Sequence, residues 1–414
     1  MWKTLFQEYF SDLKQQKLRS FLTMFSITWG TIAVVLLLSF GEGLKNTMSA
    51  GFTNAFNNVL LVYGGTTSKE YQGLPKGRSI RFTIEDIDLL KKSIPQIEKI
   101  SPSYGRWGTT LKTKLNKRTT YMEAVFPSFE DLRDMYPSSE GRFINQMDEK
   151  YRRRVVFLGD KIAKELFGDS TAVGKSLDLN GIPFKVVGVM EPKIQTSMNN
   201  GPDADRAIIP ASTFKAMYGT RYIDHMLIRP RSTRENKITK DAITRVLASR
   251  YKFDPDDENA ITVWDTIQMA KQINMVMFGI QIFLGVVGLF TLFIAGVGIA
   301  NIMYVVVKER TREIGVKLAV GARKMHIMIQ FLFEALSISL LGGVIGLGVS
   351  VGIIVLVRQA PVNDGPMQFL THPELSVPIA VICTSILVFI GFFAGFFPAR
   401  KAANLNPVES LRYE

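Results

Sequence analysis

Four long apolar runs constrain the fold of this chain more than any other feature of its sequence. Residues 20–41, 272–307, 335–357 and 375–399 contain no Asp, Glu, Lys or Arg. A helix must supply about 20 mainly apolar residues to cross the hydrocarbon of a bilayer. Each run meets this requirement, and the sequence therefore predicts transmembrane helices over residues 20–41, 272–307, 327–357 and 375–399. The second run exceeds the requirement, so we expect it to leave the bilayer as a stalk.

Basic residues at the ends of these runs predict how the chain is oriented. Lys and Arg in short loops gather on the cytoplasmic side of membrane proteins. Residues 308–326 hold six of them, whereas the loop 358–374 holds only Arg358. We therefore expect a multi-pass protein of the inner membrane, with residues 308–326 and both termini in the cytoplasm. Residues 1–19 are expected to form an amphipathic helix at the cytoplasmic interface, and residues 400–414 a cytoplasmic tail.

Residues 42–271 are then expected to form a large domain outside the cytoplasm. This segment has no Cys, so burial alone must stabilise it. Two units of strand, helix and strand lie near its ends: residues 59–63, 84–93 and 97–104, and residues 222–229, 236–250 and 260–264. We expect both units to share one domain near the membrane, with residues of about 105–220 inserted between them. The predicted fold class is an α-helical membrane protein with four transmembrane helices plus a large α+β extracytoplasmic domain.

Local signals mark three places in this outer segment. Thr83 is a predicted N-cap, and Asp86 three residues later completes a capping box. The pair Asn180 and Gly181 predicts a tight turn between two alternating strands. Residues 195–205 are polar and rich in turn-forming residues, and we expect them to form a mobile loop.

Several common sites are not expected. Gly168, Gly174, Lys175 and Ser176 resemble a phosphate-binding loop, but five residues separate the two glycines instead of four. The acidic residues of the segment 254–258 lack the pattern of a calcium loop and are interpreted as an acidic turn. The three His residues are far apart in the sequence, so no metal site is expected. Scattered basic residues outside the cytoplasm argue against nucleic acid as a partner. Catalysis by this chain is not expected.

Two features of the membrane helices leave alternatives open. Glu334 lies inside the third span near its cytoplasmic end. There it either snorkels to the interface or forms a structural ion pair, with Arg323 or Lys324 in reach, or it helps to transmit motion. Gly342, Gly343 and Gly346 allow helix backbones to approach closely. This packing serves either one subunit or a dimer, and the sequence does not separate the two.

The loop 308–326 is the strongest functional signal. It reads KERTREIGVKLAVGARKMH, in which charged residues alternate with Ile314, Val316 and Leu318. A loop that is only solvated does not need these apolar residues, whereas a short amphipathic helix that docks into a protein groove does. Gly321 and Ala322 then form a turn into the third span.

This loop closely resembles that of the MacB/FtsX-like ABC transporter permeases. The matching residues run from Lys308 to Gly315 and continue with Ala319, Gly321, Ala322, Glu334, Gly342 and Gly343. The stretch from Pro398 to Arg412 and the segments 156–168 and 186–189 match as well. The resemblance therefore covers nearly the whole chain.

The resemblance implies four spans, an outer domain with porter-like and sabre-like parts, and two permease chains that pair as a homo- or heterodimer. It implies that a cytoplasmic ABC ATPase binds ATP, so no cofactor is expected in this chain. It also implies an ATPase-coupling element, formed by Glu309, Arg310, Arg312, Glu313, Ile314, Gly321 and Ala322. A periplasmic adaptor, an outer-membrane duct and membrane lipid are further partners consistent with it.

The expected function is mechanotransmission: the chain passes ATP-driven motion from a separate ATPase to its outer domain. This would serve efflux, or extraction of cargo from the outer face of the inner membrane. The alternative is a regulatory subunit that controls an extracytoplasmic hydrolase or a sensor kinase. MacB carries its ATPase ahead of the first span, whereas only a short amphipathic stretch stands there in this sequence, which favours a separate subunit.

Overall fold

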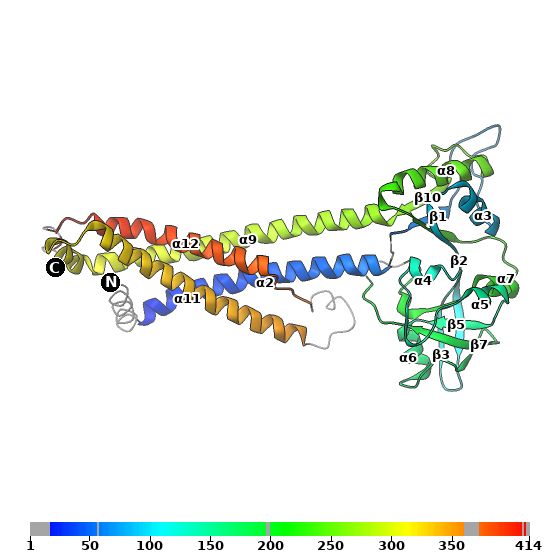
Figure 1. Cartoon of the computed structure of the whole chain (residues 1–414), viewed down its shortest axis with the longest axis horizontal. Coiled ribbons are helices and arrows are strands. Elements are labelled where there is room, and N and C mark those ends of the chain that lie inside the picture. The colour runs from blue at the N-terminus through cyan, green and yellow to red at the C-terminus, as the bar shows by residue number, and fades with distance from the viewer. Residues whose placement is uncertain (1–16, 56–57, 196–198, 360–371, 408–409, 411–414) are drawn as a thin grey trace. The chain divides into compact units, whose positions relative to one another are not determined.

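The computed structural model describes residues 17–55, 58–195, 199–359, 372–407 and 410 (Figure 1). The chain divides into two compact units. One, here called the helical unit, comprises Met1–Thr47 and Met275–Glu414, and the other, the sheet unit, comprises Met48–Asn274. The amphipathic helix expected over residues 1–19 falls mostly outside the described residues.

The part of the helical unit that the structure describes contains four long helices. They are α2 (Lys17–Ala55), α9 (Thr266–Glu309), α11 (Lys324–Arg358) and α12 (Val377–Ala403), of which α2 and α9 continue into the sheet unit. All four are long and apolar enough to cross a membrane. Many of their large apolar side chains are exposed, for example Phe283, Phe290 and Phe389, as expected of helices whose surroundings are lipid. The prediction of four transmembrane helices is confirmed.

In its described residues, the sheet unit is built on ten strands. They are β1 (Leu60–Gly64), β2 (Ile97–Lys112), β3 (Lys117–Val125), β4 (Pro137–Gly141), β5 (Val155–Leu158), β6 (Ser176–Leu179), β7 (Ile182–Met190), β8 (Arg206–Pro210), β9 (His225–Pro230) and β10 (Ile261–Asp265). The helices are α3 (Ile84–Ser93), α4 (Phe129–Leu132), α5 (Gln146–Lys150), α6 (Asp160–Phe167), α7 (Ala211–Tyr218) and α8 (Asn236–Tyr251), with the 3-10 turns η1 (Asp203–Asp205) and η2 (Thr233–Glu235). The expected mixed α/β domain is confirmed.

The two strand–helix–strand units interleave instead of lying apart. The order of strands is β10-β1-β9-β2-β3-β8-β5-β7-β4, with β6 paired to β2 and β7. Strand β9 lies between β1 and β2 and is antiparallel to both, and β1 lies between β9 and β10. Strand β9 of the second strand–helix–strand segment therefore lies between the two strands of the first, and β1 of the first lies between the two strands of the second. The interleaving joins the two ends of the outer segment into one sheet.

Both faces of this sheet are covered, so its central strands read as continuous apolar runs. In β1, Leu60 and Val62 belong to one buried cluster, whereas Val59 and Leu61 belong to another. Strands β5, β8 and β9 divide their side chains between the same two clusters. Side chains that alternate between the faces of a strand produce this division.

Two local predictions agree with the structure. Helix α3 has the expected capping box, in which Asp86 accepts a hydrogen bond from the backbone N–H of Thr83 at 2.7 Å. The turn between β6 and β7 has positive φ at Asn180 (49°) and Gly181 (88°), the backbone conformation that this pair of residues tolerates best.

The sheet unit is tied together where the chain leaves α2 and enters α9. The hydroxyl of Thr266, the first residue of α9, accepts a hydrogen bond from the N–H of Val59 at 3.0 Å. The same hydroxyl donates to the carbonyl oxygen of Val59 at 2.7 Å. No residue intervenes between β10 and α9, because Asp265 ends the strand and Thr266 begins the helix.

Candidate functional site

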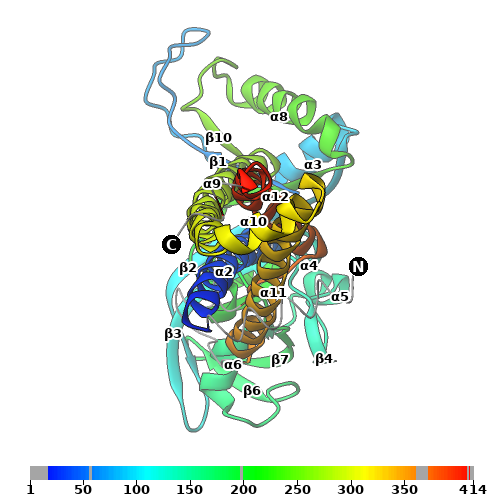
Figure 2. The ribbon, with the colours of Figure 1, turned by 90° about the vertical axis from the view of Figure 1, so that its left-hand side faces the viewer.

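The segment between α9 and α11 forms the short helix α10 (Thr311–Ala319). Figure 2 shows α10 at the end of the helix bundle. Its inner side is packed tightly, since Ile314 is only 3% exposed and Gly315 is buried. A Cβ added to Gly315 would lie 2.5 Å from the Cβ of Ser410. Gly321, with φ of 100°, then turns the chain toward α11.

The outer side of α10 carries the charged residues. Glu309, Arg312, Glu313 and Gly321 are exposed, and Ala322 is half-buried. Lys317 forms an ion pair with Glu313 one helical turn away, at 3.0 Å. Of the seven residues that the sequence predicted for the coupling element, Ile314 thus belongs to the chain's own core. Arg310 is the second residue that faces inward.

Arg310 pairs with Glu334 of α11, at 3.5 Å between its Nη1 and a carboxylate oxygen. Both side chains are largely buried, at 16% and 14% exposed. The sequence suggested Arg323 or Lys324 as the partner of Glu334. The structure gives Arg310 instead, while Lys324 donates to the Oδ1 of Asn404 at 3.3 Å. This ion pair joins the start of α10 to the third membrane helix.

Gly342, Gly343 and Gly346, three of the five glycines of α11, pack against other helices of this chain. A Cβ on Gly342 would lie 3.0 Å from the Cβ of Ile27 in α2, and one on Gly346 would lie 2.7 Å from the Cβ of Thr31. A Cβ on Gly343 would lie 2.8 Å from the Cδ1 of Leu387 in α12. The hydroxyl of Thr28 also donates to the carbonyl of Gly342 at 3.1 Å. These glycines therefore let α11 approach α2 and α12.

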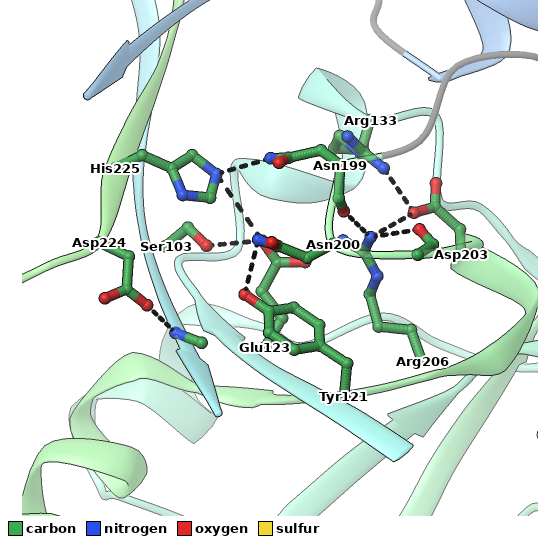
Figure 3. A network of polar contacts seen from close by, with 12 residues as sticks. Ser103, Tyr121, Glu123, Arg133, Asn199, Asn200, Asp203, Arg206, Asp224 and His225 are labelled. Atoms are coloured by element: carbon green, nitrogen blue, oxygen red, sulfur yellow. Dashed lines mark hydrogen bonds and ion pairs between the residues drawn. The ribbon is translucent and has the colours of Figure 1, made fainter. Parts of the chain in front are cut away.

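A second constellation is a buried polar network in the sheet unit (Figure 3). At its centre, the Asp203 carboxylate lies 2.5 Å from Arg133, 3.0 Å from Lys193 and 3.4 Å from Arg206. Arg206 also pairs with Glu123, to which Ser103 donates a hydrogen bond at 2.5 Å. All these residues except Lys193 are essentially inaccessible to water.

His225 of β9 and two asparagines of the loop between β7 and β8, Asn199 and Asn200, complete the network. His225 lies 3.2 Å from the amide nitrogen of Asn199 and 4.0 Å from Glu123. Asn200 donates to the hydroxyl of Tyr121 at 3.0 Å. Arg206 donates to the carbonyl oxygen of Gly201 at 2.9 Å. The network therefore fastens residues 199–203 to β3, β8 and β9 (Figure 3).

The charges of this network determine its protonation. Burial alone would raise the pKa of Asp203, but Arg133, Arg206 and Lys193 pull that pKa well below its usual range. Burial lowers the pKa of His225 to about 4, although Glu123 acts in the opposite direction. At neutral pH, Asp203 is thus ionised and His225 is neutral.

The expectation of a mobile loop at residues 195–205 is wrong for the described part of that segment. Asp203 is 0% exposed and Asn199 only 9%. The sequence carries a signal for the network, because Glu123 stands between the apolar residues Met122 and Ala124 of β3, and Arg206 directly precedes the apolar residues 207–209 of β8. Such a charge is costly to bury unless it is paired.

Other candidate groups behave as structural features. In the acidic turn, Asp257 accepts hydrogen bonds from the backbone N–H groups of Ser68 and Lys69 at 2.7 and 3.1 Å. Lys175 donates to Ser170, and Gly168 ends α6 with a positive φ of 64°. Within the described residues, no group of three or more His, Cys, Asp and Glu side chains could hold a metal ion.

Comparisons with known proteins place the chain in a family. A family model described as MacB-like periplasmic core domain matches residues 20–246, and one described as FtsX-like permease C-terminal matches residues 285–407. The macrolide export ATP-binding/permease protein MacB of Chlorobaculum tepidum is 32% identical over 98% of this chain and 60% of its own length. MacB of Bdellovibrio bacteriovorus is 29% identical over 98% of this chain and 61% of its own length. The pyoverdine export ATP-binding/permease protein PvdT of Pseudomonas putida is 29% identical over 96% of this chain and 58% of its own length.

The chain spans about 60% of the length of these curated relatives. Two solved structures are similar to about half of it. The extracellular domain of the noncanonic ABC-type transporter YknZ from Gram-positive bacteria is 19% identical, with a TM-score of 0.42, over 50% of this chain and all of its own. The periplasmic region of MacB from Actinobacillus actinomycetemcomitans is 17% identical, with a TM-score of 0.42, over 53% of this chain and 94% of its own.

The first family model alone covers more than half of the chain, and the second covers α11, α12 and α9 from residue 285 onward. The chain therefore belongs to the MacB/FtsX-like family of ABC transporter permeases, as a multi-pass membrane component with a MacB-like periplasmic core domain.

Proposed function

We propose that this chain is the permease subunit of an ABC exporter and transmits motion from a separate cytoplasmic ATPase to its sheet unit. In this proposal both termini and α10 face the cytoplasm, and the sheet unit lies outside it. Two such chains pair, and each contacts an ATPase through α10. The work done on the sheet unit drives efflux, or extraction of cargo from the outer face of the inner membrane.

The two-sided character of α10 carries this proposal. Its inner side is held by Ile314, by Gly315 against Ser410, and by Arg310 against Glu334. Its outer side presents Arg312 and Glu313, together with Val320, which is 85% exposed. A helix that is fixed on one side and offers charged and apolar groups on the other is suited to receive a push from a partner protein.

The names of the relatives favour export over regulation. They describe export of macrolides and of pyoverdine, whereas none of these names mentions control of a hydrolase or a sensor kinase. The cargo of this chain, an adaptor and an outer-membrane duct follow only by analogy with such exporters. The regulatory alternative would use the same movement of the sheet unit.

The proposal is tested with the full chain reconstituted with its ATPase in proteoliposomes. Replacing Arg312 and Glu313 together by alanine removes exposed charges and leaves the buried side of α10 intact. We expect coupled transport to fall by about 10²-fold, which corresponds to a loss of about 2.7 kcal/mol, with unchanged insertion and unchanged thermal stability. Transport at the normal rate in this variant would exclude the outer side of α10 as the coupling surface.

A matched control removes the same two charge types elsewhere. Arg234→Ala with Glu235→Ala lies on η2 of the sheet unit and should leave coupling unchanged. Arg310→Ala tests the inner side, because it leaves Glu334 without this basic partner. It should lower both transport and the melting temperature, whereas the outer variant should lower transport alone.

A further inference from the structure

Strand β10 ends the sheet on one side and leaves a backbone edge open. In the order of strands, β10 pairs with β1, and no other strand in the described part of the chain pairs with it. Edge strands of this kind attract a further strand, and proteins usually cover or charge them. The open edge of β10 belongs to the sheet unit and is not used by the proposed coupling site.

The register identifies which backbone groups point outward. Ala260 accepts a hydrogen bond from Gly65, and Thr266 donates one to Val59, so residues 260, 262, 264 and 266 face β1. Because hydrogen bonding alternates along an antiparallel strand, the N–H and C=O groups of Ile261 and Val263 face the open edge. These are the groups that an added strand would use.

A groove of about 760 Å³ runs along this edge. One wall is β10, where Ile261, Thr262 and Val263 line it, and the opposite wall is α8, which contributes Lys240 and Arg245 among others. Figure 1 shows α8 beside β10. A groove between an edge strand and a helix is the arrangement in which several domains bind an extended peptide as an additional strand.

The charges of the groove indicate the chemistry of its occupant. Four acidic residues line it, Asp241, Asp256, Asp257 and Glu258, against two basic ones, Lys240 and Arg245. The whole chain, in contrast, has a formal net charge of +13. Asp256 and Glu258 are exposed at the end of the groove from which β10 starts. An acidic groove on a basic protein favours a basic partner.

We propose that the groove between α8 and β10 binds an extended basic segment of a partner protein as an additional strand. The segment pairs with the outward N–H and C=O groups of Ile261 and Val263. Its basic side chains face Asp256 and Glu258. Trp264, which is 47% exposed and lies against Tyr63, offers an aromatic face beside the other surface of the added strand. Because β10 continues directly into α9, a partner bound here is attached to the second membrane helix.

The test uses the full chain in phosphatidylcholine nanodiscs, because neutral lipid does not attract a basic peptide. The probe is a fluorescent, amidated heptapeptide of alternating lysine and valine, measured by anisotropy. We expect it to bind at least about tenfold more tightly than the glutamate–valine counterpart and than the same peptide N-methylated at every residue. Equal binding of the N-methylated peptide would overturn strand addition, because that peptide has no backbone N–H to donate along either edge.

Two variants of the chain locate the site. Val263→Pro removes one outward N–H and should weaken binding of the lysine–valine peptide by about tenfold or more. Asp256→Lys with Glu258→Lys should reverse the preference toward the glutamate–valine peptide. The control Asp88→Lys with Asp169→Lys places the same charge change on exposed residues away from the groove, and should leave binding within about twofold.

Hydrogen exchange provides a readout that does not depend on variants. The lysine–valine peptide should slow exchange of the amides of Ile261 and Val263, and unchanged exchange there would overturn the proposal even if Val263→Pro fails to fold. A second copy of the chain is the competing occupant. If Val263→Pro converts a dimer to a monomer and the peptide does not bind, the edge belongs to that copy and the assignment to a basic partner is wrong.

Discussion

The core of the sheet unit and the contacts of α11 with α2 and α12 in the helical unit handle polar groups in opposite ways. The sheet unit buries five charged side chains around Asp203 and Glu123 and pairs them with one another. The helical unit packs its helices through glycines, and the buried contacts of Gly342 and Gly346 involve backbone and methyl groups. Water can hydrate the sheet unit when it unfolds, whereas lipid supplies no hydrogen bonds. The comparison teaches that paired charges specify the core of the sheet unit, whereas close backbone approach specifies the contacts of α11 with α2 and α12.

The largest effect is expected from the centre of the charged network. Asp203→Ala leaves Arg133, Arg206 and Lys193 buried without their shared carboxylate, and should destabilise the sheet unit by about 3–5 kcal/mol. Chemical unfolding followed by tryptophan fluorescence measures this loss. Asp205→Ala is the matched control, because Asp205 is 29% exposed and lies 3.9 Å from Lys161. A loss below about 1 kcal/mol for Asp203→Ala would show that charges do not specify this unit.

The next effect is a pH dependence that arises from His225. Its pKa is about 4 in the folded protein and about 6.5 when unfolded. The unfolded chain therefore takes up a proton as the pH falls through 6.5, while the folded chain does so only near pH 4. The contribution of His225 to the free energy of unfolding is therefore fully present above pH 6.5. It is lost as the pH falls from 6.5 to 4, by about 3 kcal/mol in total.

The measurement compares unfolding of the wild type and of His225→Gln at several values of pH across this window. The difference in stability between the two proteins should change with pH, because other groups contribute equally to both. Parallel curves would mean that His225 does not titrate between the two states.

A smaller effect is expected in the helical unit. In Gly346→Ala, the new methyl group would lie 2.7 Å from the Cβ of Thr31 and 2.9 Å from the carbonyl oxygen of Thr28. Overpacking of this kind costs about 1–3 kcal/mol. Gly348 has nothing within 4 Å of its added Cβ, so Gly348→Ala should not lower the melting temperature in detergent. If both variants melt alike, close approach between α2 and α11 does not hold this unit together.

The smallest effect sharpens the comparison at a single helix end. Thr83→Ala removes the side-chain half of the capping box of α3 and should cost about 1 kcal/mol. Asp88→Ala lies on the exposed side of the same helix and should be nearly neutral. Equal losses in the two variants, measured by urea unfolding, would contradict a specific role for the cap.

Local features of this protein could be predicted because neighbouring residues determine them. The capping box at Thr83, the turn at Asn180 and the four apolar helices each depend on a short stretch of sequence. The family likewise followed from the short stretch around Glu309 and Gly321. Propensity, turn geometry and hydrophobic length act within such stretches, so the sequence alone is enough to find them.

Features that join distant residues were missed. Glu123 and Arg206 lie 83 positions apart, and only the pairing of β3 with β8 brings them together. The sequence offers Arg323 or Lys324, which are near Glu334 along the chain, as possible ion-pair partners of Glu334, but the fold places Arg310 beside it. The interleaving of β1 and β9 has the same cause, because strand order is decided by tertiary packing and leaves no local signal.

The double hydrogen bond between Thr266 and Val59 has a mechanical consequence. It fixes to each other the two chain segments that connect the sheet to the long helices: the segment that follows α2, at Val59, and the start of α9, at Thr266. Strand β10 ends at Asp265 and α9 begins at Thr266, so no flexible linker separates the strand from the helix. If the proposed transmission of motion is right, we expect a displacement of α9 to act on the sheet directly, with the Thr266 hydroxyl holding Val59 to the same point.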